Sequence, residues 1–314
     1  MKNLNLKIMR PSGFHERIDN IVKKAQNNVT KKSGWKNNNN CPICRSKKKK
    51  IWLKKINVEI YECLICKTGY SKYIPNNLSE IYDLNSEVQD KIKSHKKRSK
   101  YFIKKFGTDR LRFIKKFKKK GSLLDFGCGT GEFINFVKKQ FKVNAFDFSL
   151  ELSKFVEANY NIKTFSNLEK LKKKFDVITL YDVLEHVENP VQLLKRLNNN
   201  LKKNGIIIVY SPNKNSLGFD ILGSNSNLCT APFHLTYFNH QTIGKFLKKK
   251  FKIVYLKTFG LDLVDIYAFL RDKYKFKFKD SDLKKIFSYQ SIIDEAHYSN
   301  HLRIVLKKIN NNTK

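Results

Sequence analysis

The sequence predicts an α/β fold in which short apolar strands alternate with helices in a parallel, doubly wound sheet. A small cysteine-rich module precedes this sheet. From residue 121 onward, apolar runs of strand length alternate with segments of helical periodicity. Ahead of them, Cys-x-x-Cys pairs at 41–44 and 63–66 predict a metal-binding ribbon. We expect four segments: a helix and linker (1–37), a zinc ribbon (38–74), a helical linker or lid (75–120) and the α/β domain (121–314), with an insertion at about 262–300.

The composition fits a folded protein with a sizeable core. The chain has 314 residues, 41% of them hydrophobic, with 24 Phe and 14 Tyr. No apolar run approaches the ~20 residues of a membrane span, and Met1 to Arg10 lacks the hydrophobic stretch of a signal peptide. We therefore expect a soluble, cytoplasmic protein without a membrane span.

The net charge of +37 is concentrated in the first third of the chain. Residues 1–120 carry 33 basic and 9 acidic groups, against 31 and 18 in residues 121–314. Such an excess is typical of nucleic-acid binders. Most of the basic groups are Lys, and Lys-rich faces are usually only solvated. We favour the solvated surface as the explanation of the charge, and RNA remains an alternative partner.

A glycine-rich loop follows the first strand of the α/β domain. The apolar run Leu123-Leu124-Asp125-Phe126 breaks into glycines at 127, 129 and 131, and helical spacing resumes from Glu132 to Lys139. Without Cβ atoms the backbone approaches a ligand closely, and a helix N-terminus offers unpaired N–H groups. Tight turns also select glycine. The spacing G-x-G-x-G, with an acid before it, differs from the G-x-G-x-x-G of pyrophosphate binders.

An acid ends the second strand, which we expect at 143–149. Asp147 follows Gly131 by 16 residues, close to where a dinucleotide fold places its ribose-binding carboxylate. The alternative is that Asp147 caps the following helix, expected at 150–158. Ser149 can fill that role, which leaves Asp147 for a ligand.

Four cysteines have the spacing of a structural zinc site. Cys41 and Cys44 are separated from Cys63 and Cys66 by 18 residues. Two such knuckles joined by a hairpin can close a tetrahedral site, and the runs 51–53 and 58–61 supply its strands. Free buried cysteines or a redox pair are the weaker alternatives, because neither pair lies on a strand-to-helix turn.

The remaining elements follow from periodicity and turn residues. An amphipathic helix with Phe14, Ile18, Ile21, Val22 and Ala25 on one face is expected to dock on the protein. A helix should run from Ser86 to Lys120 with a break near Gly107 to Asp109. We expect further strands at 162–165, 175–181 and 206–210, the last after a turn at Asn204-Gly205, helices at 193–201 and 241–249, and final strands at 253–258 and 302–307.

Several of these motifs resemble those of a known family. Leu124-Asp125-Phe126-Gly127-Cys128-Gly129-Thr130-Gly131 is similar to the first motif of class I S-adenosylmethionine-dependent methyltransferases. Phe175-Asp176-Val177-Ile178, Asp182-Val183-Leu184-Glu185-His186-Val187 and Ser211-Pro212-Asn213 resemble the small-molecule branch, with its ubiquinone-type O-methyltransferases and sugar methyltransferases. The resemblance covers about 110–310, and an N-terminal four-cysteine ribbon resembles the sugar C-methyltransferases. It implies a Rossmann-like, seven-stranded sheet with an antiparallel last strand.

The resemblance also implies a set of site residues. S-adenosylmethionine would be bound by Asp125, Gly127, Cys128, Gly129, Gly131, Asp147, Phe148, Asn167 and Tyr181. Asn167 stands where the family often has an acid for the adenine amine. His186 is the first candidate base, with an ordinary pKa of about 6.5, and a purely structural histidine is an equal alternative. Glu185 would orient cofactor or substrate, and His234 is the second candidate base.

Two functions are weighed. The first is methylation of a small molecule, such as a sugar or surface-polysaccharide precursor. The second is an RNA methyltransferase that holds RNA with the ribbon and the basic N-terminal third. The tip Tyr181-Asp182-Val183-Leu184-Glu185-His186 is not the Asn/Asp-Pro-Pro-aromatic signature of exocyclic-amine methylation, and no Pro-Cys nucleophile is present. The sequence favours the small molecule and leaves the oligomeric state open.

Overall fold

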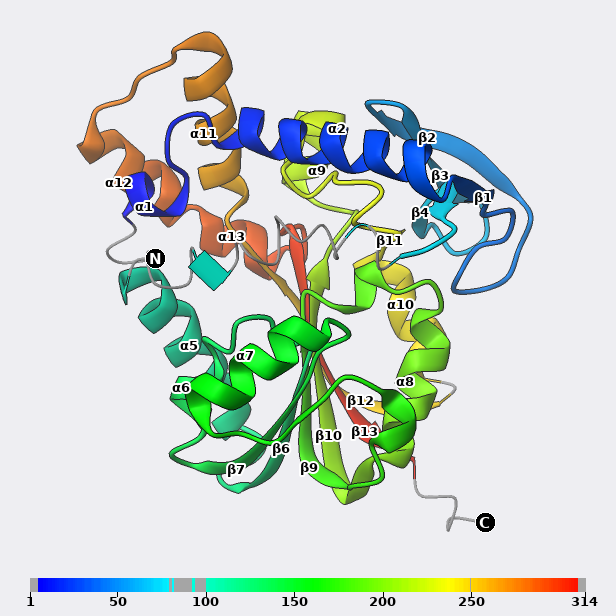
Figure 1. Cartoon of the computed structure of the whole chain (residues 1–314). Helices are drawn as coiled ribbons and strands as arrows, with labels where there is room; N and C mark the ends of the chain where they lie inside the picture. The colour runs from blue at the N-terminus through cyan, green and yellow to red at the C-terminus, as the bar shows by residue number, and fades with distance from the viewer. Residues whose placement is uncertain (1–4, 79–80, 82–91, 94–99, 249, 310–314) are drawn as a thin grey trace.

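The computed structural model describes residues 5–78, 81, 92–93, 100–248 and 250–309. A central sheet carries helices on both faces, and further elements lie across one end of it (Figure 1). The blue helix α2 (Phe14–Lys32), the insertion helices and the cysteine-rich ribbon form this end layer. The ends of the sheet and the end layer together enclose the candidate site described below.

The central sheet has seven strands in the order β12-β13-β10-β9-β6-β7-β8. Strands β8, β7, β6, β9 and β10 are parallel, whereas β13 is antiparallel to both of its neighbours, β10 and β12. This confirms the expected α/β fold with an antiparallel last strand. The bounds are β6 Gly121–Phe126, β7 Phe141–Phe146, β8 Thr164–Phe165, β9 Phe175–Tyr181, β10 Leu201–Pro212, β12 Phe251–Phe259 and β13 His301–Lys308.

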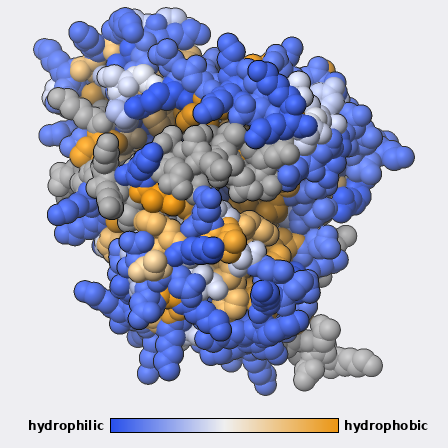
Figure 2. Space-filling view, viewed as in Figure 1, coloured by the Kyte–Doolittle hydropathy of each residue, from blue (hydrophilic) through white to orange (hydrophobic). Residues whose placement is uncertain are grey.

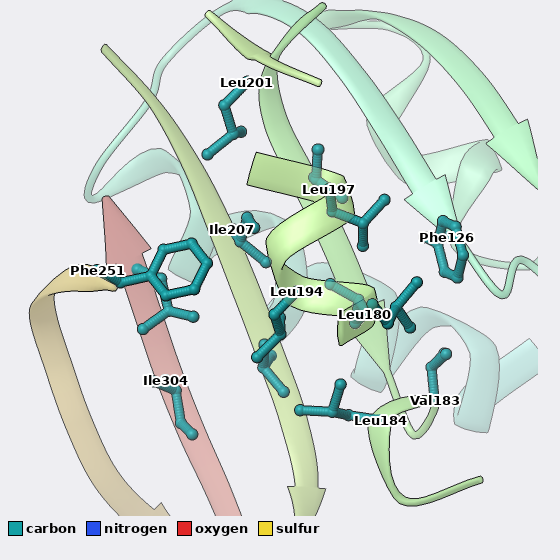
Figure 3. Packing of buried hydrophobic residues seen from close by; sticks show 14 of the residues in the cluster. Phe126, Leu180, Val183, Leu184, Leu194, Leu197, Leu201, Ile207, Phe251 and Ile304 are labelled. Carbon is teal, nitrogen blue, oxygen red and sulfur yellow. The ribbon is translucent and has the colours of Figure 1, made fainter. Parts of the chain in front are cut away.

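Successive side chains of the inner strands point to opposite faces and build two cores. On β10, Ile206 and Ile208 pack toward helices α5 and α6, whereas Ile207 and Val209 pack toward α8 and α10. Figure 3 shows Ile207 in the same cluster as Leu194 and Leu197 of α8. This alternation is the period of two expected for a strand buried on both sides. The helices are α5 Lys100–Lys115, α6 Ile134–Val137, α7 Leu150–Tyr160, α8 Pro190–Asn199 and α10 His240–Leu247.

The ribbon is joined to the α/β domain through a shared sheet. Strands β2 (Lys49–Lys55), β3 (Val58–Cys63) and β4 (Gly69–Ser71) form a four-stranded sheet whose edge strand, β11, comes from the distant segment Thr236–Tyr237. A buried ion pair adds to the junction, because Lys214 Nζ lies 2.6 Å from Glu62 Oε2. A second small sheet pairs β1 Trp35–Asn37 with β5 Tyr73–Pro75.

The N-terminal helix docks on the protein as predicted, but it is longer and its buried face differs. It extends to Lys32 and buries Val22, Ala25 and Val29, while Ile21 is 45% exposed. Gln26, also buried, donates to the carbonyl oxygens of Lys55 and Ala231. The other elements of the end layer are α1 Leu6–Met9, α9 Leu217–Leu222 and the insertion helices α11 Asp262–Tyr274, α12 Asp280–Ser288 and α13 Gln290–Glu295.

Two glycines predicted to break or turn the chain lie inside assigned elements. Helix α5 runs through Gly107 without a break, so the predicted break was wrong; a Cβ there would lie 2.2 Å from the ring of Phe136. Strand β10 is assigned through Gly205, but its register with β9 shifts between Leu201 and Ile206, so Asn204-Gly205 lies in an irregular part of the strand. A Cβ on Gly205 would lie 2.8 Å from the carbonyl oxygen of Phe175. The part of the predicted 86–120 helix before residue 100 lies outside the described residues, apart from 92–93.

The helix after the glycine loop is shorter than predicted. It covers only Ile134–Val137, and β7 begins at Phe141, two residues before the expected strand. The viewed surface is largely hydrophilic (Figure 2), as the high content of charged residues requires. No helix within the described part of the chain is long and apolar enough to cross a membrane.

Candidate active site

A cavity of about 750 Å³ lies at the carboxyl ends of the parallel strands. Its floor comes from the loop after β6, the tip after β9 and the end of β10, and α5 forms one wall. The segment before α2 and the insertion close the opposite side with Arg10, Asp265 and Asn300. Ligands of open α/β sheets bind at this edge, and the volume is that of a small-molecule site.

The glycine loop opens into this cavity. Gly127 has φ +77°, and a Cβ on it would lie 2.4 Å from Val183 Cγ2, so only glycine fits without displacing that side chain. Gly129 has φ +55° and has no neighbouring atom within 4 Å of a Cβ position. The loop backbone therefore packs against Val183 at Gly127 and is open to a ligand at Gly129.

Asp147 is tied to the glycine loop. Its carboxylate accepts hydrogen bonds from the backbone N–H groups of Gly129, at 2.9 Å, and Ser149, at 3.0 Å. The side chain of Ser149 caps α7 by accepting from the N–H of Leu152. Asp147 is thus not the helix cap, and it stands next to the loop position that is open to a ligand.

Four predicted cofactor residues, Gly131, Asp147, Phe148 and Asn167, are not part of the cavity lining. Phe148 is 58% exposed and packs edge-on against Phe146. Asn167 is exposed, and its side-chain oxygen accepts from the N–H of Glu169, where it caps the short helix Leu168–Lys170. Its amide oxygen is therefore already engaged in its own turn.

Asp125 and Tyr181 lie under the loop and line the cavity. Burial raises the pKa of Asp125 to about 6, although a 2.8 Å hydrogen bond from Thr179 Oγ1 and the charge of Arg110 act in the opposite direction. Tyr181 is 7% exposed and packs against Phe133. The Arg110 guanidinium covers its ring at 4.2 Å.

The three candidate catalytic side chains come together at the tip of β9. Glu185 is fully buried, and its Oε2 accepts from Ser211 Oγ at 2.8 Å. Its Oε1 has no hydrogen-bond partner among the described residues. Burial raises the pKa of Glu185 well above its ordinary value, and the charge of Asp182 adds to the effect. Both effects favour the protonated form of the carboxyl group.

The histidine rings lie 4.8 Å apart, and the backbone fixes the tautomer of each. His186 Nδ1 is 2.7 Å from the carbonyl oxygen of Phe233, and His234 Nδ1 is 2.8 Å from that of Leu228. Because a carbonyl oxygen only accepts, Nδ1 carries the proton and Nε2 is the basic nitrogen in the neutral ring. Burial, followed by the charge of His186, lowers the pKa of His234 well below its ordinary value.

The ligand atoms of the same three side chains are close enough together to hold a metal ion. The ligand atoms of Glu185, His186 and His234 all lie within 4.8 Å of one another. Two imidazoles and a carboxylate are a donor set suited to divalent transition metals. Of the three side chains, Glu185 and His234 line the cavity.

The four ribbon cysteines form a second, separate cluster. Their sulfur atoms lie within 4.8 Å of one another, with Cys41 to Cys66 at 3.4 Å and Cys44 to Cys63 at 3.5 Å. A tetrahedral zinc with Zn–S bonds of about 2.3 Å requires sulfur separations of roughly 3.8 Å. Small movements would therefore fit the cluster to zinc.

Sequence reasoning missed several cavity residues. Arg110 Nη2 lies 3.4 Å from Asp182 Oδ2, and His301 Nε2 lies 3.9 Å from Asp182 Oδ1. Arg303, two residues after His301 on β13, also lines the cavity. A signal was present in the last strand, where polar residues at 301 and 303 alternate with the buried Leu302 and Ile304. Polar side chains on one side of an otherwise buried strand suggest a site at its end.

Comparison with known proteins agrees with this geometry. The model of a family described as a methyltransferase domain matches residues 96–264. The chain belongs to this family. A ubiquinone biosynthesis O-methyltransferase from Rickettsia canadensis is 30% identical over 172 residues, covering 51% of this chain and 70% of the relative. An uncharacterised protein from Methanocaldococcus jannaschii is 38% identical over 109 residues, 33% of this chain and 47% of that protein, so the chain spans about half of its length.

Among solved structures, a methyltransferase from Archaeoglobus fulgidus is 20% identical and covers 67% of this chain and 100% of its own, with a TM-score of 0.46. The family match and the glycine-loop cavity together identify the activity. The protein is an S-adenosylmethionine-dependent methyltransferase.

Proposed function

We propose that this methyltransferase acts on a small polar molecule, such as a sugar or a surface-polysaccharide precursor. The observation that carries the proposal is the cavity itself. At about 750 Å³ it has room for the cofactor and a small acceptor. Residues of the N-terminal segment and of the insertion line the cavity and bound its volume. A macromolecular acceptor would need an open approach to the loop.

In this proposal the cofactor lies on the loop formed by Gly127, Cys128, Gly129 and Gly131. Asp147 accepts hydrogen bonds from the ribose hydroxyls, because its carboxylate stands beside the open side of Gly129. Asp125 and Tyr181 form the floor of the cofactor site. Helix α5, which lies within the predicted lid segment 75–120, covers the cofactor. Phe148 and Asn167 would contribute only at the outer edge.

The bound cofactor supplies an activated methyl group, so the protein has to align the acceptor and take its proton. We assign proton removal to Nε2 of His234, which lines the cavity. His186 lies behind it and modulates its basicity, so the order of the two candidate bases is the reverse of the sequence-based order. The protonated Glu185 orients an acceptor hydroxyl by hydrogen bonding.

The lining opposite the loop favours a hydroxylated acceptor. Asp265, Asp294 and Asn300 face the cavity from the insertion, and Arg10 reaches it from the N-terminal segment. Carboxylate and amide groups can pair with both the donor and the acceptor side of a hydroxyl group. A molecule with several hydroxyls, such as a sugar, meets these requirements.

We further propose that the ribbon binds one structural zinc ion through Cys41, Cys44, Cys63 and Cys66. The ribbon strand β4 pairs with β11, which begins two residues after His234, so the ribbon supports the loop of the proposed base. None of the six cysteines forms a disulfide bond. This state suits a reducing compartment, and a cytoplasmic location is part of the proposal.

The proposal can be tested with methyl-labelled S-adenosylmethionine. The purified protein is incubated with a mixture of nucleotide sugars and, separately, with total RNA. Label should enter the small-molecule fraction, and His234→Asn should reduce the incorporation at least ~100-fold, the usual size of a general-base contribution. Ser288→Ala, on the exposed side of the insertion, serves as the control. Label entering only RNA would contradict the proposal.

A further inference from the structure

We propose that Arg303 forms a binding site for an oxyanion, a phosphate or carboxylate group of the acceptor molecule, at the β13 side of the cavity. The inference rests on the proposed small-molecule function and narrows its substrate class to anionic acceptors. It is carried by the surroundings of one guanidinium group. Three observations support it: its aromatic frame, its missing counter-ion and the phenols next to it.

Aromatic rings hold the Arg303 guanidinium in place. Its central carbon lies 4.1 Å from the ring centre of Phe259, 4.5 Å from that of Phe113 and 4.6 Å from that of Tyr210. Rings stabilise a cation but accept few of its five N–H hydrogens. The group is thus fixed in position with its donors still to be satisfied.

Within the described residues, Arg303 has no carboxylate within ion-pair distance, and its buried Nε has no hydrogen-bond partner. The other two arginines of the cavity are paired, Arg10 with Asp265 at 2.5 Å and Arg110 with Asp182 at 3.4 Å. Arg303 as a whole is half-buried, so the cost of lost hydration falls mainly on its shielded Nε. An anionic ligand would remove this cost at Arg303.

Two phenols extend the same site. Tyr181 and Tyr210 both line the cavity, their rings are 4.7 Å apart, and neither hydroxyl has a hydrogen-bond partner in the described structure. Burial raises the pKa of both phenols above the ordinary value. They therefore remain O–H donors at neutral pH. A guanidinium with neighbouring O–H donors suits an oxyanion with two or more oxygen atoms.

The position of Arg303 assigns the anion to the acceptor rather than to the cofactor. In the sheet, β10 and β9 separate β13 from β6, which carries the glycine loop. Three strand spacings of about 4.8 Å place Arg303 roughly 14 Å from that loop. Arg110, whose charge acts on Asp125 below the loop, is the better partner for the carboxylate of the cofactor.

The test measures thermal unfolding of the full chain in saturating S-adenosylhomocysteine, titrated with inorganic phosphate or acetate at constant ionic strength. We expect a saturable rise of the melting temperature that Arg303→Gln weakens at least ~10-fold and Arg303→Lys weakens less. Arg196→Gln, which removes an exposed arginine on α8, should leave the rise unchanged. The anion that raises the melting temperature at the lower concentration indicates whether the acceptor carries a phosphate or a carboxylate.

Three outcomes would overturn the proposal. The anion effect could be equal in Arg303→Gln and the wild type, it could occur only when S-adenosylhomocysteine is omitted, or Arg303→Gln could lose S-adenosylhomocysteine binding by calorimetry while remaining folded. The second and third would assign the site to the cofactor. Phosphate binding through Arg303 in a protein that does not bind S-adenosylhomocysteine would support the anion site and contradict the cofactor site. Failures of the two proposals are therefore distinguishable.

Discussion

At the residue scale, each glycine of the loop after β6 has its own physical reason. Gly127 is required by the neighbouring Val183 and by its positive φ. Gly129 is required by its positive φ and by the space that it leaves open. The two positions should therefore respond differently to the same substitution.

Gly127→Ala should mainly lower stability, because the new Cβ meets Val183 and the backbone is strained. We expect a loss of about 1–3 kcal/mol in unfolding free energy. Gly129→Ala should cost only about 1 kcal/mol in strain and should weaken S-adenosylhomocysteine binding, because its Cβ enters the open space. Denaturant unfolding and calorimetry measure the two effects. Equal stability losses with unchanged affinity would show that the cofactor does not lie against Gly129.

Also at this scale, Asp176 joins the starts of β6 and β9. Its Oδ2 accepts from the Ser122 N–H at 2.7 Å and lies 2.7 Å from Lys202 Nζ. Burial acts to raise the pKa of Asp176, but the hydrogen bonds from Lys202 and Ser122 prevail and lower it to about 2.

The sign of the pH dependence follows. In the unfolded chain an Asp has a pKa of about 3.9, so the folded state binds the proton less readily. The stabilisation by the Asp176 carboxylate is complete above pH ~4 and is lost as the pH falls toward ~2. The difference in unfolding free energy between the wild type and Asp176→Asn should therefore shrink over this window. A difference that stays constant from pH 5 to pH 2 would contradict the assignment.

At the element scale, the ribbon and the segment around β11 form one structural unit. Strand β4, just after the second cysteine pair, is hydrogen-bonded to Thr236 and Tyr237. Thr242 donates to the Cys66 carbonyl oxygen at 2.6 Å, which adds a second tie between ribbon and domain. Loss of the proposed zinc ion should thus disturb the His234 loop before it disturbs the glycine loop.

We expect one zinc ion per chain, lost in the Cys41→Ser/Cys63→Ser double variant. In that variant, amide hydrogen exchange at 236–237 should rise, since β11 loses its partner, while S-adenosylhomocysteine affinity should change less than about 3-fold. Elemental analysis and exchange mass spectrometry measure this. Cys229→Ser, outside the cluster, should retain the zinc. Zinc surviving the double change would rule out the proposed ligands.

The strands were predictable at this scale, and some of the connections were not. Phe175–Tyr181 was found because a buried parallel strand is a continuous apolar run. Gly107 misled the prediction, because a glycine that permits close packing has the same sequence signature as one that ends an element. Only its tertiary neighbour, the ring of Phe136, distinguishes the two cases.

At the scale of the whole molecule, the cavity is built from segments far apart in the chain. Arg10 pairs with Asp265, 255 residues away, and both line the side opposite the glycine loop. Local periodicity contains no information about such a pair. The glycine loop was predictable because it is contiguous in the sequence, whereas the side of the cavity opposite it was not.

The net charge of +37 is also a property of the whole molecule. If it is only a solvated surface, RNA should bind weakly, with each phosphate contact adding roughly 0.7–0.9 to the salt slope. We expect no saturable RNA binding at ~0.15 M salt, where the Debye length is about 8 Å. Neutralising Lys47 to Lys50 should leave methyl transfer to the acceptor intact. Sequence-selective RNA binding that depends on these lysines would favour the RNA alternative.

The central claim is that S-adenosylmethionine binds across the glycine loop and Asp147, and calorimetric titration with S-adenosylhomocysteine tests it most directly. The wild type should bind one molecule per chain. Asp147→Ala should weaken binding about 10-fold or more, or at least 1.4 kcal/mol, whereas Glu151→Ala, which removes an exposed carboxylate in the first turn of α7, should not. Unchanged affinity in Asp147→Ala, or no binding by the wild type, would contradict the account.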